Sequence, residues 1–148
     1  MRITSSFDIS ASALTAQRLR MDVIASNIAN AETTRGQYIN GRWVPYQRKL
    51  VVLEPSGQPT FADVLRGQMN HPGEGVKVTR IYGDPAPFKQ VYNPTHPDAD
   101  ENGFVLMPNV DVLKEMVDMI SATRSYEANV TALNASKAMV TKALEIGR

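Results

Sequence analysis

The residues that come closest to a chemical site form an acidic turn, Asp98-Ala99-Asp100-Glu101-Asn102-Gly103. Their oxygen-bearing side chains and their glycine match positions 1, 3, 5 and 6 of a calcium-binding loop. Position 12 of such a loop is a bidentate glutamate, but this chain has Asn109 there. Pro94 and Pro97 also exclude the helix that would enter the loop. An acidic turn before a strand explains the same residues, so a calcium-regulated binding module rests on this turn alone and no metal site is predicted.

No other group of residues has the pattern of a catalytic site. The two histidines, His71 and His96, each precede a proline, and no further ligand lies at zinc spacing from either. Gly73-Glu74-Gly75 is too short for a phosphate-binding loop and leads into a strand. The chain has no cysteine, which excludes disulfides, thiolate catalysis and cysteine-bound metal. We therefore expect no enzyme activity and no cofactor.

Composition excludes two further classes of function. The formal net charge of the 148 residues is +1, so no strong field favours nucleic acid or an anionic membrane. No stretch approaches the 18 or so consecutive apolar residues of a membrane span, so membrane insertion is not expected. The first residues lack the basic start and apolar run of a secretory signal. If such a protein leaves the cytoplasm, its export must depend on a feature other than a secretory signal peptide.

The breaker residues divide the chain into three parts. All nine prolines lie between Pro45 and Pro108, and eight of the nine glycines lie between Gly36 and Gly103. Because proline breaks helices and glycine weakens them, long helices are expected only at the two ends. The predicted division is an N-terminal helix in residues 1–35, a C-terminal helix in 109–148, and a β-rich middle module in 36–108. The two helices together would form one helical axial domain.

The C-terminal stretch has an apolar row with the spacing of a helix. Its ten positions are Val112, Met116, Met119, Thr123, Tyr126, Val130, Leu133, Lys137, Val140 and Leu144. The steps alternate between four and three residues, which places the row on one helix face. Leu113, Val117 and Ile120 widen it over the first turns. At about 1.5 Å per residue the helix would be roughly 58 Å long, which is too long for this chain's own core to cover. The row therefore favours packing on other helices, from this chain or from a partner.

The N-terminal stretch repeats this design and sets the fold class. A helix is predicted from about Ser6 to Asn30, with the row Phe7, Ala11, Leu14, Arg18, Met21, Ala25 and Ile28, broadened by Ile24 and Ala31. The two rows can pair in a coiled-coil-like unit, and the fold class is then α+β. In the middle, Asn40-Gly41 predicts a hairpin within Tyr38–Trp43. Further strands are expected at Tyr46–Leu53, Val76–Tyr82, Phe88–Tyr92 and Phe104–Met107, a strand or helical turn at Phe61–Arg66, and a loop at Met69–Gly75.

Several motifs resemble those of bacterial flagellar rod, hook and hook-associated proteins. Ala25-Ser26-Asn27-Ile28-Ala29-Asn30-Ala31-Glu32-Thr33 is similar to the N-terminal signature of that family, with Ser26 replacing an asparagine and Arg35-Gly36 replacing the usual Pro-Gly. Tyr92 to Asp100, Gly103-Phe104-Val105, Pro108 to Asp111 and Arg124 to Asn129 resemble a rod protein of the proximal rod. The residues that carry the resemblance are Asn27, Asn30, Thr33, Pro94, Pro97, Asp98, Asn109, Tyr126 and Asn129.

The resemblance implies a structural subunit that assembles helically into the shaft crossing the periplasm. It implies export by the flagellar type III apparatus without a cleaved signal peptide. The implied partners are other proximal rod proteins, the rod–ring junction protein, the distal rod protein and further copies of the chain. The subunit interface is then expected along the helix rows, at Leu14, Met21, Ile24, Ile28, Val112, Met116, Met119, Tyr126, Val130, Leu133, Val140 and Leu144. Another axial protein of the family, or a non-catalytic helical adaptor or chaperone, remains the alternative.

Overall fold

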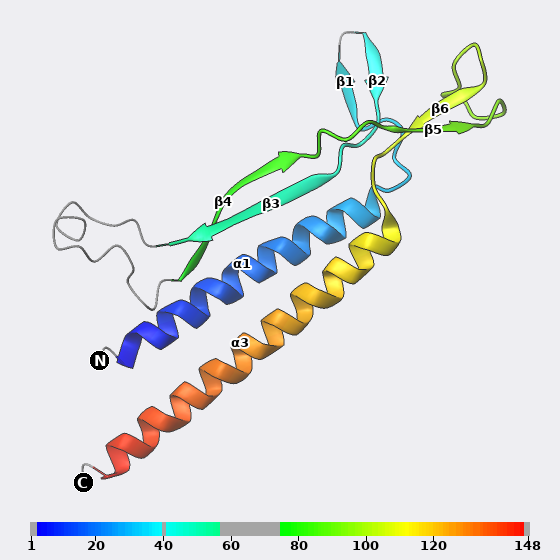
Figure 1. The fold of residues 1–148 in the computed structure, drawn as a ribbon. Helices are drawn as coiled ribbons and strands as arrows, with labels where there is room; N and C mark the ends of the chain where they lie inside the picture. Colours follow the sequence, from blue (N-terminus) through cyan, green and yellow to red (C-terminus); the bar gives the residue numbers. More distant parts are fainter. Residues whose placement is uncertain (1–2, 40, 57–74, 147–148) are drawn as a thin grey trace, which may run out of the picture. The chain divides into compact units, whose positions relative to one another are not determined.

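A computed structural model describes residues 3–39, 41–56 and 75–146 of the chain. The elements run in the order α1 (Ile3–Ala29), β1 (Gln37–Ile39), β2 (Arg42–Val44), β3 (Lys49–Pro55), β4 (Val76–Gly83), β5 (Lys89–Tyr92), β6 (Phe104–Met107) and α3 (Val112–Ile146) (Figure 1). Two terminal helices and small antiparallel strand pairs make this an α+β fold, as the sequence predicts. The predicted segment Phe61–Arg66 and all of Met69–Gly75 except Gly75 lie outside the described residues.

Local hydrogen bonds explain where the two helices end and begin. Beyond α1, both the backbone N–H and the side-chain amide of Asn30 donate to the carbonyl of Ser26, at 3.1 and 2.9 Å. The helix α3 begins behind Asp111, whose carboxylate accepts from the backbone N–H of Leu113 at 3.1 Å as an N-cap. Glu115 adds a negative charge in the first turn, where the helix dipole favours it.

The predicted hairpin at Tyr38–Trp43 is confirmed. Strands β1 and β2 pair antiparallel, with Tyr38 opposite Trp43 and Ile39 opposite Arg42. This register leaves two residues for the turn, and Gly41 has a φ of 80°, which a glycine adopts without the strain of a side chain. Asn40, the other turn residue, is not among the described residues.

The other four strands form two more pairs, β3 with β4 and β5 with β6. In the second pair Lys89 lies opposite Met107 and Tyr92 opposite Phe104, antiparallel. The strand predicted to start at Tyr46 begins only at Lys49. The cause is that the backbone amides before it bond elsewhere: Tyr46 N–H donates to Thr33 O at 3.1 Å, and Arg48 N–H to the side chain of Asn109 at 2.8 Å.

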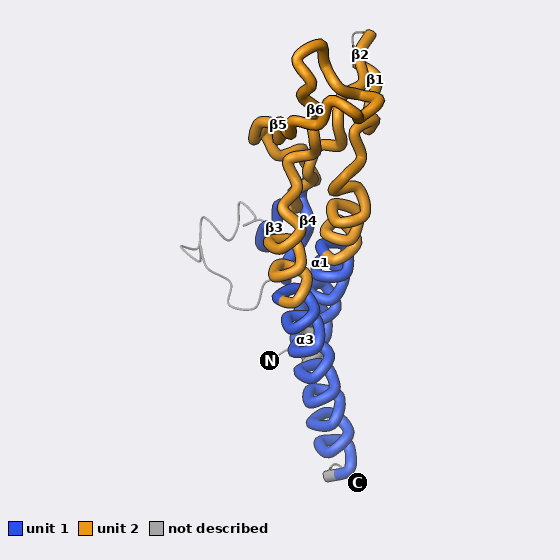
Figure 2. The backbone as a smooth tube through the Cα atoms, turned by 90° about the vertical axis from the view of Figure 1, so that its right-hand side faces the viewer, with its two compact units in different colours: residues 1–20, 52–80, 121–148 blue, residues 21–51, 81–120 orange. Residues whose placement is uncertain are grey.

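The chain divides into two compact units, coloured separately in Figure 2. Residues 1–20, 52–80 and 121–148 form the first unit, and residues 21–51 and 81–120 form the second. In the first unit the hydroxyl of Ser12 accepts from the backbone N–H of Val76 at 3.1 Å, so the start of β4 is tied to α1. The second unit contains the hairpin β1–β2, the pair β5–β6 and the polar residues described below.

The inward face of α3 differs in part from the predicted apolar row. The buried or half-buried row is Glu115, Met119, Ala122, Tyr126, Asn129, Leu133, Ser136 and Val140. Four members of this row belong to the predicted one, whose Thr123 and Val130 are half-buried as well. The remaining predicted positions are exposed, namely Val112, Met116, Lys137 and Leu144. The row that faces inward in the isolated chain also contains Glu115, Ala122 and Asn129, which are charged, small and polar, so a search for apolar spacing does not select them.

The inward face of α1 likewise differs in part from the predicted row. Its buried residues are Ser10, Ala16, Val23, Ile24 and Asn27, while the predicted Ala11, Arg18 and Ala25 are exposed. The predicted Leu14, Met21 and Ile28 are half-buried. The most buried position near the end of this helix holds an asparagine, which a search for apolar spacing passes over. That asparagine belongs to the candidate site.

Candidate functional site

A cluster of polar side chains lies at the centre of the second unit. Asn27 on α1 and Glu115 on α3 are each 1% exposed, and the Arg48 side chain, just before β3, is also largely buried. Buried polar groups of this kind persist when their hydrogen bonds are made within the protein. The hydrogen bonds within the cluster therefore fix the positions of the segments that carry these three residues.

Asn27 uses both ends of its side-chain amide. Its nitrogen donates to the carbonyl of Lys49 at 2.9 Å and to Glu115 Oε2 at 3.0 Å. Its oxygen accepts from the backbone N–H of Lys49 at 2.9 Å and from the hydroxyl of Tyr46 at 3.0 Å. Two donors and one carbonyl oxygen with two lone pairs are what an amide supplies. The residue thus joins α1, the start of β3 and the first turn of α3.

Arg48 lies among three carboxylates. Its Nε donates to Glu115 Oε1 at 2.6 Å, and its terminal nitrogens lie 3.3 Å from Asp84 Oδ2 and 3.6 Å from Asp118 Oδ2. Burial is the largest influence on the pKa of Arg48 and lowers it. The hydrogen bonds and negative charges of Glu115 and Asp84 together outweigh burial and raise the pKa above its ordinary value. Removing one member of such a set leaves an unpaired buried charge.

Asn109 extends the cluster toward the loop after β4. Its side-chain oxygen accepts from the backbone N–H of Arg48 at 2.8 Å, and its nitrogen donates to the carbonyls of Asp84 and Ala86 at 3.2 and 3.0 Å. The residue after the buried Pro108 therefore fixes the chain as it approaches α3. Asn27 and Asn109, both singled out by their motifs, act on the same part of the second unit.

Asp98 of the acidic turn makes hydrogen bonds to residues of its own chain. Asp98 accepts from Thr34 Oγ1 at 2.8 Å and from Arg35 Nε at 2.7 Å, and its backbone N–H donates to His96 Nδ1 at 3.1 Å. The hydrogen bond from Arg35, followed by that from Thr34, lowers the pKa of the Asp98 carboxyl below its ordinary value of 3.8. Within the described ranges, no three His, Cys, Asp or Glu side chains are grouped to hold a metal ion.

The first turns of α3 carry an exposed group of apolar side chains. Leu113, Val117 and Ile120 are 75, 65 and 60% exposed, and Val112 and Met116 lie beside them, also exposed. Single exposed apolar residues are common, whereas here five lie within nine positions of one helix. We call these five residues the α3 surface. No helix in the described part of the chain is long and apolar enough to cross a membrane.

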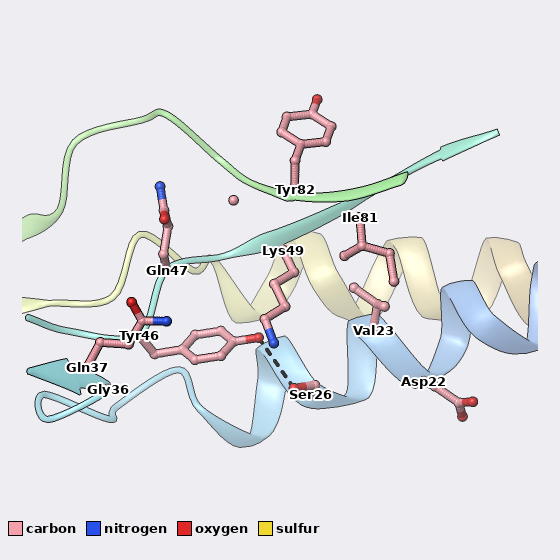
Figure 3. Close-up of a pocket in the computed structure, with 11 residues that line it drawn as sticks. Asp22, Val23, Ser26, Gly36, Gln37, Tyr46, Gln47, Lys49, Ile81 and Tyr82 are labelled. Carbon is pink, nitrogen blue, oxygen red and sulfur yellow. Dashed lines mark hydrogen bonds between the residues drawn. The ribbon is translucent and has the colours of Figure 1, made fainter. Parts of the chain in front are cut away.

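An open groove of about 690 Å³ lies between α1 and the strands in the second unit (Figure 3). Val23 and Ser26 line it from the helix, Lys49 from β3, and Ile81 and Tyr82 from β4. Ser26 Oγ lies 3.3 Å from the hydroxyl of Tyr46, and Lys49 Nζ lies 5.7 Å from the centroid of the Tyr46 ring. The groove holds no acid–base pair or nucleophile arrangement of the kind that catalysis requires.

The remaining motif residues fall at separate places. Asn30 and Thr33 bond each other at 3.2 Å beyond α1, and Pro94 and Pro97 are exposed in the turn between β5 and β6. Tyr126 and Asn129 are half-buried on α3 in the first unit. Sequence reasoning missed Arg48, Asp84, Glu115 and Tyr46 as members of the polar cluster. The available indication was Asn27, a polar residue three positions after Ile24 on the buried side of α1.

Comparison with known proteins finds relatives that match this chain over almost its whole length. The family described as "Flagella basal body rod protein" matches residues 7–36, and "Flagellar basal body rod FlgEFG protein C-terminal" matches residues 101–146. The flagellar basal-body rod protein FlgC of Bacillus subtilis (strain 168) is 58% identical over 146 residues, covering 97% of each chain. That of Borreliella burgdorferi is 44% identical over 99% of this chain and 98% of its own. That of Salmonella typhimurium (strain LT2) is 45% identical over 100% of both.

The matched regions include the main elements of the fold. The two family regions contain most of α1 with Asn27 and all of α3 with Glu115, the two elements that the polar cluster joins. The relatives extend over the strand pairs as well, at an identity well above the level at which a shared fold is in doubt. The chain belongs to the FlgC family of flagellar basal-body rod proteins, structural components of the bacterial flagellum.

Proposed function

We propose that this chain is a non-catalytic subunit of the proximal rod, assembling helically into the part of the flagellar shaft that crosses the periplasm. The observation that carries the proposal is the α3 surface, which no described part of the chain covers. Burying an exposed Leu, Val or Ile contributes about 1.5–3 kcal/mol per side chain, so covering several of them at every subunit favours assembly strongly. Other rod components of the basal body are the natural partners for such a surface.

We propose further that α1 and α3 pair in a coiled-coil-like axial domain, formed by residues 1–35 and 109–148 around the β-rich module of 36–108. The half-buried Met119, Tyr126, Leu133 and Val140 repeat at steps of seven residues along α3, which is the spacing of such a pair. The polar cluster supports the pairing because buried polar contacts define the register of paired helices.

The specific partners follow from the same proposal. They are the other proximal rod proteins, the rod–ring junction protein, the distal rod protein and further copies of this chain. Delivery through the flagellar export apparatus, without a cleaved signal peptide, belongs to the proposal as well. The interface residues expected on the helices remain part of it, and the exposed Val112, Met116 and Leu144 are accessible to a neighbour in the isolated chain.

A charge within the α3 surface tests the proposal. Val117→Asp places a carboxylate at a position that is 65% exposed, so the isolated chain should keep its stability within about 0.5 kcal/mol. In the assembled rod the same carboxylate would be buried without a partner, which costs several kcal/mol at each contact. Cells whose only copy is the Val117→Asp chain should complete no rods and should not swim.

Asn102→Asp is the matched control, because it adds the same charge on an exposed turn outside the helices. Cells with this variant should swim normally. Electron microscopy of basal bodies and urea unfolding of the purified chains separate an assembly defect from a folding defect. Normal rods in cells with Val117→Asp would refute the proposal that α3 is an assembly surface.

A further inference from the structure

The second unit carries both a protruding arm and a groove. The arm is the hairpin β1–β2, with the exposed side chains of Tyr38, Ile39, Arg42 and Trp43. The groove is the 690 Å³ space of Figure 3, a size within the range of about 300–1,000 Å³ that is typical of ligand sites. Gln37 at the base of the arm lines the groove of its own chain, whereas Tyr38, Ile39, Arg42 and Trp43 do not.

The arm presents two different faces. Tyr38 and Trp43 lie opposite each other in the register and meet edge to face, with ring centroids 5.2 Å apart. Ile39 and Arg42 form the next pair, and because side chains alternate along a strand they lie on the other face. Tyr38 and Trp43 are 63 and 53% exposed. Such aromatic residues are enriched in the contacts that dominate protein interfaces.

The groove has two matching walls. On the α1 wall, the largely buried Val23 leaves a small apolar surface at the groove, and Asp22 lies at the rim with its carboxylate pointing away from the strands (Figure 3). On the strand wall, Ile81 and Lys49 offer an apolar surface and a cation. An ammonium group is attracted to the faces of tryptophan and tyrosine rings, and a carboxylate to a guanidinium.

We propose that the β1–β2 arm of one copy inserts into the α1–β4 groove of a second copy. The aromatic pair packs on Lys49 and Ile81 of the strand wall. Ile39 packs on Val23 of the α1 wall, and Arg42 pairs with Asp22 at its rim. The inference rests on the proposed function in one respect, that copies of this chain meet in the rod.

Charge and symmetry favour a second copy as the occupant. Among the described residues neither Arg42 nor Asp22 has an ion-pair partner within its own chain, so each charge is available to a neighbour. The four side chains of the arm that would make the contact lie outside the groove, so the contact is heterologous. A heterologous contact that does not close into a ring generates an open helical chain, which is the geometry that a rod requires.

Disulfide cross-linking tests the contact directly, because the chain contains no cysteine of its own. A tagged chain with Ile39→Cys is mixed with an untagged chain with Ser26→Cys and oxidised, and the tagged–untagged product is measured. We expect this product to form several times faster than that from Ile39→Cys with Asn102→Cys, a control position outside the groove. In a single chain carrying both Ile39→Cys and Ser26→Cys, oxidation should give a ladder of multimers.

A charge exchange provides the second measurement. Arg42→Asp in the Ile39→Cys chain should slow cross-linking several-fold, and Asp22→Arg in the Ser26→Cys chain should restore it. Cross-linking no faster than the control would overturn the arm-in-groove contact, as would an internal disulfide in the doubly substituted chain. The proposed function is judged separately by the Val117→Asp rods. If Val117→Asp rods are defective but no cross-linking occurs, the proposed function is supported and only the arm-in-groove contact is refuted.

Discussion

The side-chain amide of Asn27 donates a hydrogen bond of 3.0 Å to the carboxylate of Glu115, across a sequence separation of 88 residues. Both side chains are 1% exposed, so water cannot replace the bond if either partner is lost. The contact joins the end of α1, where the family motif lies, to the first turn of α3. A structural subunit needs such a contact because the exposed α3 surface is useful only if its position on the subunit is fixed.

Because Arg48 pairs with buried charges, its substitution should destabilise the fold more than that of any other residue in the cluster. Arg48→Met should lower the free energy of unfolding by about 3–5 kcal/mol, since it leaves the buried Glu115 carboxylate without its cation. Urea unfolding of the purified chain measures the loss, with an unchanged slope showing that the folded state is otherwise the same.

Arg124→Met is the control for that substitution. Arg124 lies 3.7 Å from Glu127 on α3, but both side chains are mostly exposed. The loss there should stay within about 1 kcal/mol. Equal losses at Arg48 and Arg124 would show that the polar cluster contributes no more than a surface ion pair.

Asn27→Ala should lower the free energy of unfolding by an amount on the order of 3 kcal/mol, because several buried partners lose a hydrogen bond at once. Tyr46→Phe removes only the hydroxyl that donates to Asn27, so about 1 kcal/mol is expected. The double variant should lose less than the sum of the two single losses, because the two substitutions remove a shared bond. Strict additivity would mean that the two side chains do not interact in solution.

Asp98 provides a test by pH. Its pKa is lowered in the folded chain, first by the hydrogen bond from Arg35. Its contribution to stability is therefore fully present above the ordinary pKa of 3.8 that it has in the unfolded chain, and is lost as the pH falls through the lower folded value. The stability difference between the parent and Asp98→Asn should be constant from neutral pH down to that region and then shrink. Arg35→Gln should raise the pKa of the Asp98 carboxyl in an NMR titration, and an unchanged pKa would contradict the assigned cause.

Two glycines with the same backbone conformation make a matched pair. Gly41 and Gly103 have φ angles of 80 and 78°, so alanine at either costs about 1–2 kcal/mol of backbone strain. An added Cβ at Gly103 would also lie 2.9 Å from the ring of Tyr92, whereas one at Gly41 meets nothing within 4 Å. Gly103→Ala should therefore lower the melting temperature more than Gly41→Ala. The reverse order would show that the ring of Tyr92 moves away at no cost.

The sequence predicts the long elements well because their cause is local. The absence of proline and glycine at the two ends indicates both helices, and Asn40-Gly41 indicates the hairpin. The buried faces are predicted only in part, because Asn27 and Glu115 are polar residues whose burial depends on partners far along the chain. Arg48 and Asp84 could not be placed in the site for the same reason, since no spacing rule links a residue before β3 to one after β4.

The covering of the α3 surface in the assembled rod can be measured with one substitution. Val117→Cys introduces the chain's only thiol at an exposed position. A maleimide reagent should label this thiol readily in the isolated chain and should fail to label it in purified basal bodies until they are dissociated. Equal labelling of Val117→Cys in the isolated chain and in intact basal bodies would contradict the account, because the α3 surface would then remain open to solvent in the rod.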